Sequence, residues 1–407
     1  MNFLKQGLDP SNAKRKLASI QEIKSVNPIE NADAIEVAKV LGWEVVVKKG
    51  SVKEGDKIVY FEIDSFLPPS EKYSFVGKER INPITLGSDS EVRGIRLATV
   101  VLRGQVSQGL IVKFQDLDPT PSGKSIEELV EYLSSLEVGT EVTEILGVQK
   151  FERPEILGEL GKIVGTFPSH YISQTDEERV QNEPKDYKEI KGGSYYITSK
   201  VDGSSITNIW ANGELVSATR NNTLGRENEI KKLLEKNSVL EMLRKNNQNI
   251  IFQSELYGVK IQKNSLGIVG NRLATFTISE DGAVLGLEEM LDKVDQFNLE
   301  IPEIIEIGSD DEEELNRILQ KIEEINSKRE DVDPTKTSSG LLKIKVHNVR
   351  NSNMNYTINE LIEKANGRKY STSKNLEEGF VVRPIKKTNT RKPISFKVLN
   401  NKFLLKD

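Results

Sequence analysis

Short β-branched runs, separated by turns that contain glycine, fill the first 115 residues of the chain. The runs read WEVVVKKG, KIVYFEIDSFLP, IRLATVVLRG and SQGLIVKF, with segments such as KKGSVKEGD between strands. Runs of this length bounded by turn residues are typical of β-strands. About five strands in so short a region favour a small barrel of the OB type. OB barrels often bind nucleic acid, although a docking or purely structural barrel would show the same pattern.

A helical pattern follows these strands. In SIEELVEYLSSL three leucines recur at helical spacing, and a glycine soon afterwards is expected to end the helix. The next segment, LGVQKFERPEILGELGK, has no clear period and contains Pro154. We therefore expect an OB-like N-terminal domain with a short helix and linker over residues 1–155, and a second domain over residues 156–407.

Strands and helices are mixed in the second domain. SYYITSKVDG, SSITNIWANGELVSATRN, NIIFQSELYGV, RLATFTIS and GFVVRP resemble strands, whereas ENEIKKLLEKNSVLEMLRKN, LEEMLDKVDQF and EEELNRILQKIEEI resemble helices. TINELIEKANGR offers Thr357 as a helix N-cap and Glu360 as its capping-box partner. The pattern predicts an α+β domain of antiparallel sheets with helices outside. A helical insertion is expected over about residues 285–370.

The composition of the chain excludes several kinds of functional site. The 407 residues include no cysteine and two histidines, so thiolate metal sites, disulfides and cysteine nucleophiles are excluded. The net charge of −5 does not by itself indicate nucleic-acid binding, but nine Lys or Arg against three acids lie between Lys374 and Asp407. No apolar run has the length of a membrane span, and the first residues lack the pattern of a signal peptide. A reducing cytoplasm is the expected compartment, with no membrane partner.

The stretch TSKVDGSSI raises the question of whether Lys200 is a nucleophile or an ordinary lysine. Lys200, Asp202 and Gly203 form a K-x-D-G pattern that also describes a charged β-turn. Similar charges stand in other strand-like segments, namely Arg220 in SATRN, Glu255 in FQSELYG, Glu378 in EEGFVVRP and Lys397 in PISFKVLN. A single charged residue in such a segment usually lies on the solvent-exposed face of a sheet, because burying an unpaired charge is costly. Finding several in one domain weakens that explanation.

Taken in order, these residues resemble the motifs of the covalent nucleotidyltransferases, a superfamily of polynucleotide ligases and mRNA capping enzymes. Phe276 in LATFTIS and Gly379 after Glu378 extend the resemblance. One position departs from it, because many relatives carry a second lysine where Leu399 stands. This leaves the number of basic contacts to the phosphates open.

The position of the barrel selects a branch of this superfamily. Capping enzymes and most DNA ligases carry an OB domain after the last motif, whereas only ten residues follow Lys397 here. A barrel at the front resembles one clade of ATP-dependent RNA ligases, as do the stretches LRGQVSQGL, EVTEILGVQKFERP and FPSHYISQTDEERVQN. The implied fold is an N-terminal OB-like β-barrel followed by a nucleotidyltransferase domain, which is ATP-grasp-like, with antiparallel sheets plus helices.

The resemblance implies an ATP-dependent RNA ligase that joins 5′-phosphate and 3′-hydroxyl ends through lysyl-AMP and RNA-adenylate intermediates, in RNA repair. Its cofactors would be ATP and Mg²⁺ or Mn²⁺, and its substrate RNA with ends that meet in a nicked duplex. A monomer is expected. A DNA ligase, a GTP-dependent capping guanylyltransferase and a non-catalytic RNA-binding protein stay open as alternatives.

The resemblance also assigns roles to residues. Lys200, Asp202 and Lys397 would be catalytic. The nucleotide-binding set would be Arg179, Gln181, Gly203, Arg220, Glu255, Phe276, Glu378 and Lys397. The metal set would be Asp202, Glu255 and Glu378, because Mg²⁺ prefers oxygen ligands. An ordinary lysine, with a pKa of about 10.4, is protonated at pH 7. We therefore expect Lys397 and a metal ion to lower the pKa of Lys200.

Overall fold

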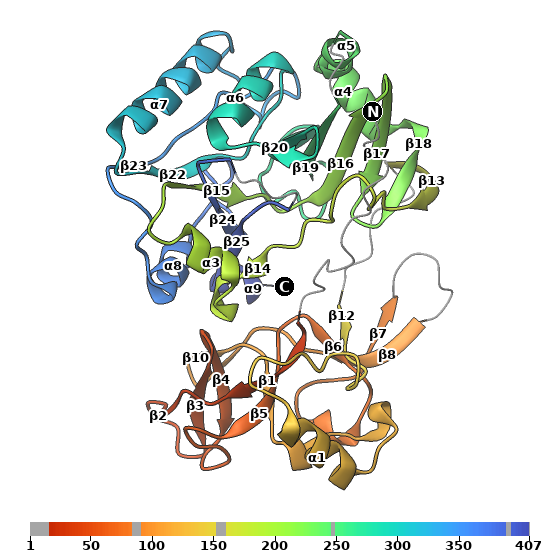
Figure 1. Cartoon of the computed structure of the whole chain (residues 1–407), viewed down its shortest axis with the longest axis vertical. Helices are drawn as coiled ribbons and strands as arrows, with labels where there is room; N and C mark the ends of the chain where they lie inside the picture. The colour runs from red at the N-terminus through yellow and green to blue at the C-terminus, as the bar shows by residue number, and fades with distance from the viewer. Residues whose placement is uncertain (1–15, 84–90, 152–159, 246–248, 388–391, 407) are drawn as a thin grey trace. The chain divides into compact units, whose positions relative to one another are not determined.

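The chain divides into two units, which Figure 1 draws in ribbon form. The computed structural model describes residues 16–83, 91–151, 160–245, 249–387 and 392–406. The N-terminal unit is built mainly from the described residues up to 151, joined by Gln181–Glu183 and residues 404–406. The second unit holds the other described residues from 160 to 403. The boundary expected near residue 155 lies outside the described residues.

Short antiparallel strands make up the N-terminal unit. One sheet contains β1 (Ala18–Glu22), β5 (Lys57–Phe61) and β11 (Leu110–Val112), and another contains β2 (Ser25–Pro28), β3 (Ile35–Val40) and β4 (Trp43–Lys48). A third contains β6 (Ser65–Leu67), β7 (Arg80–Pro83), β8 (Glu91–Arg96) and β12 (Gln149–Lys150), and β9 (Val100–Leu102) pairs with β10 (Gln105–Ser107). The run IRLATVVLRG, expected as one strand, is therefore the end of β8 and all of β9.

One helix, α1 (Ile126–Ser135), packs against these strands. Ser125 caps it, and the Glu128 side chain returns to the Ser125 backbone N–H, which completes a capping box. Leu129 and Leu133 are fully buried in a core that they share with apolar side chains of β1, β5 and β11. The helical spacing read from the sequence therefore marks the buried face of α1.

Two sheets form the second unit. The seven-stranded sheet has the order β13 (Gly161–Thr166), β18 (Asn222–Asn228), β17 (Glu214–Thr219), β16 (Ser204–Ala211), β19 (Ile250–Gly258), β20 (Asn271–Glu280) and β21 (Ala283–Val284). The six-stranded sheet has the order β14 (Glu178–Arg179), β25 (Phe396–Leu399), β24 (Gly379–Pro384), β15 (Tyr195–Lys200), β22 (Ile304–Gly308) and β23 (Val349–Arg350). Only the pairs β14–β25 and β22–β23 are parallel among these ladders of the described residues.

Helices cover both sheets (Figure 1). They are α3 (Lys185–Ile190), α4 (Glu229–Lys236), α5 (Val239–Arg244), α6 (Leu287–Gln296), α7 (Glu312–Ser327), α8 (Ile358–Ala365) and α9 (Asn401–Leu404). Apolar side chains of α4 to α7 share one core with β16, β19 and β20, whereas α3 and α8 pack on the six-stranded sheet. The helix expected over ENEIKKLLEKNSVLEMLRKN is two helices, because Ser238 between them adopts a left-handed conformation with φ 61°.

The stretch expected as a helical insertion, residues 285–370, contains α6, α7 and α8. It also contains β22, which pairs antiparallel with β15 inside the six-stranded sheet. The capping box of Thr357 and Glu360 at the start of α8 forms as expected. This stretch therefore supplies an interior strand of the sheet as well as the covering helices.

Candidate active site

The K-x-D-G segment lies where the chain crosses from one sheet to the other. Lys200 ends β15 in the six-stranded sheet, and β16 in the seven-stranded sheet begins at Ser204. A Cβ atom on Gly203 would lie 2.2 Å from the Leu256 carbonyl oxygen and 2.9 Å from Glu255 Cγ, so only glycine fits there. The glycine thus lets the crossing segment lie directly against β19.

A carboxylate from each sheet lies at this crossing. Glu378 immediately precedes β24, whose Gly379 pairs with Lys200, and its Oε2 lies 2.6 Å from Lys200 Nζ. Glu255 lies on β19 and pairs with Ser205 in the ladder to β16. The side chains of Lys200 and Glu378 are 22% and 19% exposed, so solvent or a ligand can still reach the pair.

These carboxylates control the protonation of Lys200. Burial lowers the pKa of Lys200, but the charges of Glu378 and Glu255 outweigh burial and raise it above the usual value. Burial also raises the pKa of Glu378, an effect that the Lys200 charge opposes, and it raises the pKa of Glu255 to about 8. The expected net lowering of the Lys200 pKa is therefore wrong for the protein groups alone, because the acidic neighbours dominate.

Asp176 brings together two basic residues that are far apart in sequence. Its carboxylate lies 3.3 Å from Lys397 Nζ on β25 and 3.3 Å from an Arg220 guanidinium nitrogen just after β17. Arg179, three residues later, is buried and pairs with Lys397 in the parallel β14–β25 ladder. The structure thus places Arg220 and Lys397 on either side of a carboxylate that sequence reasoning did not identify, with Arg179 beside Lys397 in the ladder.

Arg383 is a second residue that sequence reasoning missed. From β24 it donates to Thr198 Oγ1 at 3.1 Å, and it lies 3.4 Å from Glu177 Oε1. Its guanidinium carbon is 5.6 Å from the centre of the Phe276 ring, a cation–π distance. The signal in the sequence was the same as for Lys397, a single cation in an apolar strand.

Phe276 itself lies at an irregularity in the sheet. Gln253 pairs with Thr277 and the next residue, Ser254, pairs with Thr275, so Phe276 is the extra residue of a β-bulge. Bulges re-aim side chains and are frequent beside functional sites. The ring is therefore turned toward Arg383 by the backbone and is only partly buried.

Asp202 is held tightly, whereas Gln181 belongs to another part of the molecule. Ser265 Oγ donates to Asp202 Oδ2 at 2.7 Å, and the Asp202 side chain is almost completely buried. Gln181 is buried too, but it groups with the N-terminal unit, where its backbone carbonyl accepts from the Gly42 N–H at 2.8 Å. Of the expected site residues, Gln181 alone is assigned to that unit.

Two models of known protein families match this chain. The model of a family described as RNA ligase matches residues 193–399, which includes every motif from Lys200 to Lys397. The chain belongs to the RNA ligase family. The model of an OB-fold domain matches residues 17–114. Both the resemblance and the α+β fold class with an N-terminal OB domain are thereby confirmed.

Solved structures of an RNA ligase from Naegleria gruberi are similar over nearly the whole chain. A lysine-to-alanine variant with ATP and Mn is 29% identical, with a TM-score of 0.73 over 96% of this chain and 99% of that one. The form with PPi is 29% identical, with a TM-score of 0.72 over 97% and 99%. A lysine-to-methionine variant with AMP and Mn is 28% identical, with the same TM-score and coverage as the PPi form. No curated protein matched.

The acidic residues of this RNA ligase family member do not form a ready-made metal cage. Within the described ranges, no three His, Cys, Asp or Glu side chains lie close enough together to hold an ion by themselves. Mg²⁺ usually keeps several waters and binds through one or two carboxylates plus substrate phosphates. The partly exposed carboxylate of Glu378 and the Glu255 carboxylate across the crossing fit that mode of binding.

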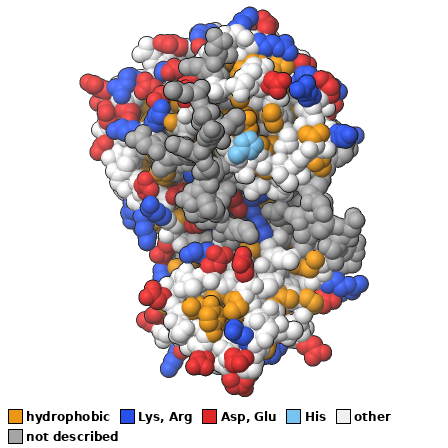
Figure 2. Space-filling model, turned by 45° about the vertical axis from the view of Figure 1, so that its right-hand side comes forward, with side chains coloured by type: hydrophobic (Ala, Val, Ile, Leu, Met, Phe, Trp, Pro, Cys, Tyr) orange, Lys and Arg blue, Asp and Glu red, His pale blue; other side chains and the backbone are white. Residues whose placement is uncertain are grey.

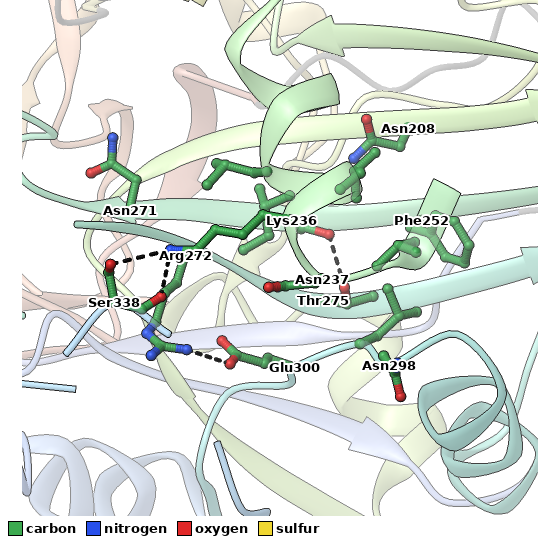
Figure 3. Close-up of a pocket in the computed structure, with 16 residues that line it drawn as sticks. Asn208, Lys236, Asn237, Phe252, Asn271, Arg272, Thr275, Asn298, Glu300 and Ser338 are labelled. Carbon is green, nitrogen blue, oxygen red and sulfur yellow. Dashed lines mark hydrogen bonds and ion pairs between the residues drawn. The ribbon is translucent and has the colours of Figure 1, made fainter. Parts of the chain in front are cut away.

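Another cavity of the same RNA ligase domain contains none of the expected site residues (Figure 3). It is lined from α4, β19 and β20, and its two charged contacts are Arg272 with Glu300 at 2.5 Å and Lys236 with Ser338. Arg272 and Glu300 are buried against one another.

Among the helices of the described residues, none is both long and apolar enough to cross a membrane.

Proposed function

We propose that this chain is an ATP-dependent RNA ligase that uses Lys200 as its nucleophile and joins 5′-phosphate to 3′-hydroxyl ends. The observation that carries the proposal is the position of Lys200 at the crossing of the two sheets, paired with Glu378 and close to the charge of Glu255. The similar Naegleria gruberi structures contain ATP, AMP or PPi, which are the reactant and products that a lysine adenylation step would involve.

In the first step Lys200 Nζ attacks the α-phosphorus of ATP, an N–P bond forms and pyrophosphate leaves. The ammonium has to lose a proton before it attacks, and the Glu378 carboxylate at 2.6 Å lies at hydrogen-bond distance to accept it. Lys397 and Arg220 supply positive charge for the phosphates once these displace Asp176 from them. Phe276 offers its partly exposed ring to the adenine, and Arg179, the ladder partner of Lys397, supports that lysine.

In the later steps the AMP moves to the 5′-phosphate of RNA, and the 3′-hydroxyl then attacks that phosphate and releases AMP. Asp202, fixed by Ser265, serves this last step, so its loss cripples sealing more than adenylation. A divalent cation held by Glu255 or Glu378 together with the substrate phosphates would add positive charge at the phosphates. Gln181, in the N-terminal unit of the present structure, is the least direct member of the nucleotide set.

The proposed substrate is RNA with ends that meet in a nicked duplex, and the proposed setting is RNA repair in the cytoplasm by a monomer. Figure 2 shows basic and acidic side chains intermixed over one face of the molecule, which suits recognition by local cationic clusters better than by a uniformly basic surface. The OB-fold region adds a domain of a class that often binds nucleic acid.

The test is to incubate the protein with α-labelled ATP, and separately with α-labelled GTP, in the presence of Mg²⁺. Label from ATP should remain on the denatured chain and be absent from Lys200→Ala. Label from GTP alone would assign the protein to a capping guanylyltransferase. If neither nucleotide labels a sample first stripped with pyrophosphate, the chain is a non-catalytic RNA-binding protein. Sealing of nicks with RNA or DNA on the 3′-hydroxyl side then separates RNA ligase from DNA ligase.

A further inference from the structure

One buried hydroxyl contacts the backbone at both sides of the site. Tyr370 OH donates to the Lys200 carbonyl oxygen at 2.9 Å and accepts from the Asp202 N–H at 3.1 Å. The Glu378 N–H points to the same oxygen at 3.4 Å. The Tyr370 side chain is only 3% exposed. A single oxygen therefore joins the segment that carries the nucleophile to the segment that carries its carboxylate partner.

The loop that carries Tyr370 is itself fixed to the other side of Asp202. After α8 this loop turns back on itself, with the Tyr370 N–H bonded to the Asn375 carbonyl at 2.9 Å. Ser373 Oγ and Asn375 Nδ2 donate to the carbonyl of Ser265 at 2.6 and 2.9 Å. Ser265 in turn donates to Asp202 through its side chain. The loop thus holds both the backbone and the carboxylate of Asp202.

We propose that Tyr370 is a positioning residue for lysine adenylation, whose hydroxyl fixes Lys200 and Glu378 relative to one another. This inference rests on the function proposed above. Tyr370 touches no reacting atom, because its three contacts are all with backbone groups. Its effect reaches the reaction through the direction in which the Lys200 side chain leaves β15.

The physical reason is that attack on phosphorus depends steeply on alignment. A misplacement of about 1 Å can cost roughly 10²-fold in rate. Without the hydroxyl, the Lys200 carbonyl and the Asp202 N–H lose a partner in a buried place, and the crossing segment has to move or admit water to recover one. Binding of ATP draws on Lys397, Arg220 and Phe276, none of which contacts Tyr370 in the described hydrogen bonds.

The experiment compares Tyr370→Phe with wild type in single-turnover adenylation over a range of ATP concentrations. The maximal rate should fall about 10- to 100-fold, while the ATP concentration at half-maximal rate stays within about twofold. Tyr195→Phe is the matched control. Tyr195 lies on β15, the strand that ends at Lys200, and its buried hydroxyl donates to Glu306 at 2.6 Å. That variant should lose stability but keep the adenylation rate of its folded fraction.

Amide hydrogen exchange on the protein without nucleotide gives a second readout. The Asp202 and Glu378 amides should exchange faster in Tyr370→Phe than in wild type. In Tyr195→Phe their exchange rates should equal those of wild type. A Tyr370→Phe enzyme with the wild-type rate, or with a loss equal to its unfolded fraction, would overturn the positioning role. Failure of the proposed function appears differently, as a wild-type chain that ATP does not label, and it would remove the positioning role as well.

Discussion

The Lys200–Glu378 pair and the Arg272–Glu300 pair lie in the same domain, yet their surroundings differ. Arg272 also donates to the Gly340 carbonyl at 3.0 Å, and Glu300 accepts from the Leu342 N–H at 3.0 Å, with side chains 4% and 3% exposed. Lys200 and Glu378 are 22% and 19% exposed. In the described part of the chain, Lys200 Nζ and Glu378 Oε2 hydrogen-bond only to each other.

This difference separates an ion pair that holds the fold from one that can react. The Arg272–Glu300 pair is enclosed by backbone groups and fastens the segment around Gly340 to β20, so it cannot exchange partners without unfolding that segment. The Lys200–Glu378 pair has few other contacts, so Lys200 can leave its partner for a phosphorus atom. Two ion pairs of similar length therefore have opposite roles because of what surrounds them.

The largest effect should come from removing the reactive cation. Lys200→Met should lower adenylation by on the order of 10⁴-fold or more, because no other amine replaces the nucleophile. Stability should change by less than about 1 kcal/mol, since the Glu378 carboxylate is 19% exposed and can be hydrated or take up a proton once its cation is gone. Labelling with α-labelled ATP and urea denaturation measure the two quantities. A stable variant that is still labelled at the wild-type rate would contradict the comparison.

The enclosed pair should respond in the opposite way. Arg272→Met should lower the free energy of unfolding by about 3–5 kcal/mol, because it leaves Glu300 buried without its cation. The adenylation rate per folded molecule should stay near that of wild type. Lys236→Met, which alters an exposed lysine beside the same cavity, is the control and should stay within about 0.5 kcal/mol. A large loss of rate at full folding would assign Arg272 to the site.

Glu306 extends the comparison to pH. Burial alone would raise the pKa of Glu306, but donors from Lys364, Tyr195 and Asn348 outweigh burial and lower the pKa. The unfolded chain therefore binds a proton at a higher pH than the folded one. The stabilisation is complete above the ordinary glutamate pKa of about 4.3 and is lost as pH falls through the lower folded value.

Glu306→Gln should cost about 1–3 kcal/mol at pH 7 and should remove this part of the acid-induced loss. Urea denaturation at pH 7 and at several pH values below 4.3 measures both effects. Adenylation by the folded variant should be retained, because Glu306 contacts Tyr195 and Lys364 rather than Lys200. If the free energy of unfolding fell equally with pH in the variant and in wild type, Glu306 would not be the group that causes the acid-induced loss.

The smallest effect should come from the carboxylate that pairs with Lys397 and Arg220. Asp176→Asn should tighten pyrophosphate binding by about two- to fivefold at low salt, since its charge competes with phosphate oxygens for Lys397 and Arg220. The gain should shrink as salt is added. Glu214→Gln, at the exposed pair with Arg226, should leave binding unchanged. Weaker binding by Asp176→Asn would instead make Asp176 a positioning residue.

The sequence predicted the site residues that lie in recognisable local patterns. Lys200 begins the K-x-D-G pattern at the end of a short strand, and Glu378 directly precedes a glycine and a short apolar strand, so their strands and order along the chain could be read directly. The pairing of Asp176 with Lys397 could not be read from the sequence. The two residues are 221 positions apart, and nothing in either segment indicates the other. Tyr370 lies in a loop without a period and reaches Lys200 across 170 positions.

The same limit applies to the fold. Capping residues and apolar spacing predicted α7 and α8, because those signals lie within a few residues of one another. The left-handed Ser238 that divides α4 from α5 has no such local mark. The strand β22 was missed because its five residues, IIEIG, are too short a segment to separate a buried strand from a helix, and only its partner β15 decides.

The central claim is that Lys200 Nζ, and no other amine, carries AMP. The most direct measurement is peptide mapping by mass spectrometry after the full chain has been incubated with ATP and Mg²⁺. The account predicts AMP on the peptide that contains Lys200, with fragmentation placing it on that side chain, and none on the peptide that contains Lys397. AMP on Lys397 or on any other lysine, or none on a chain stripped with pyrophosphate beforehand, would contradict it.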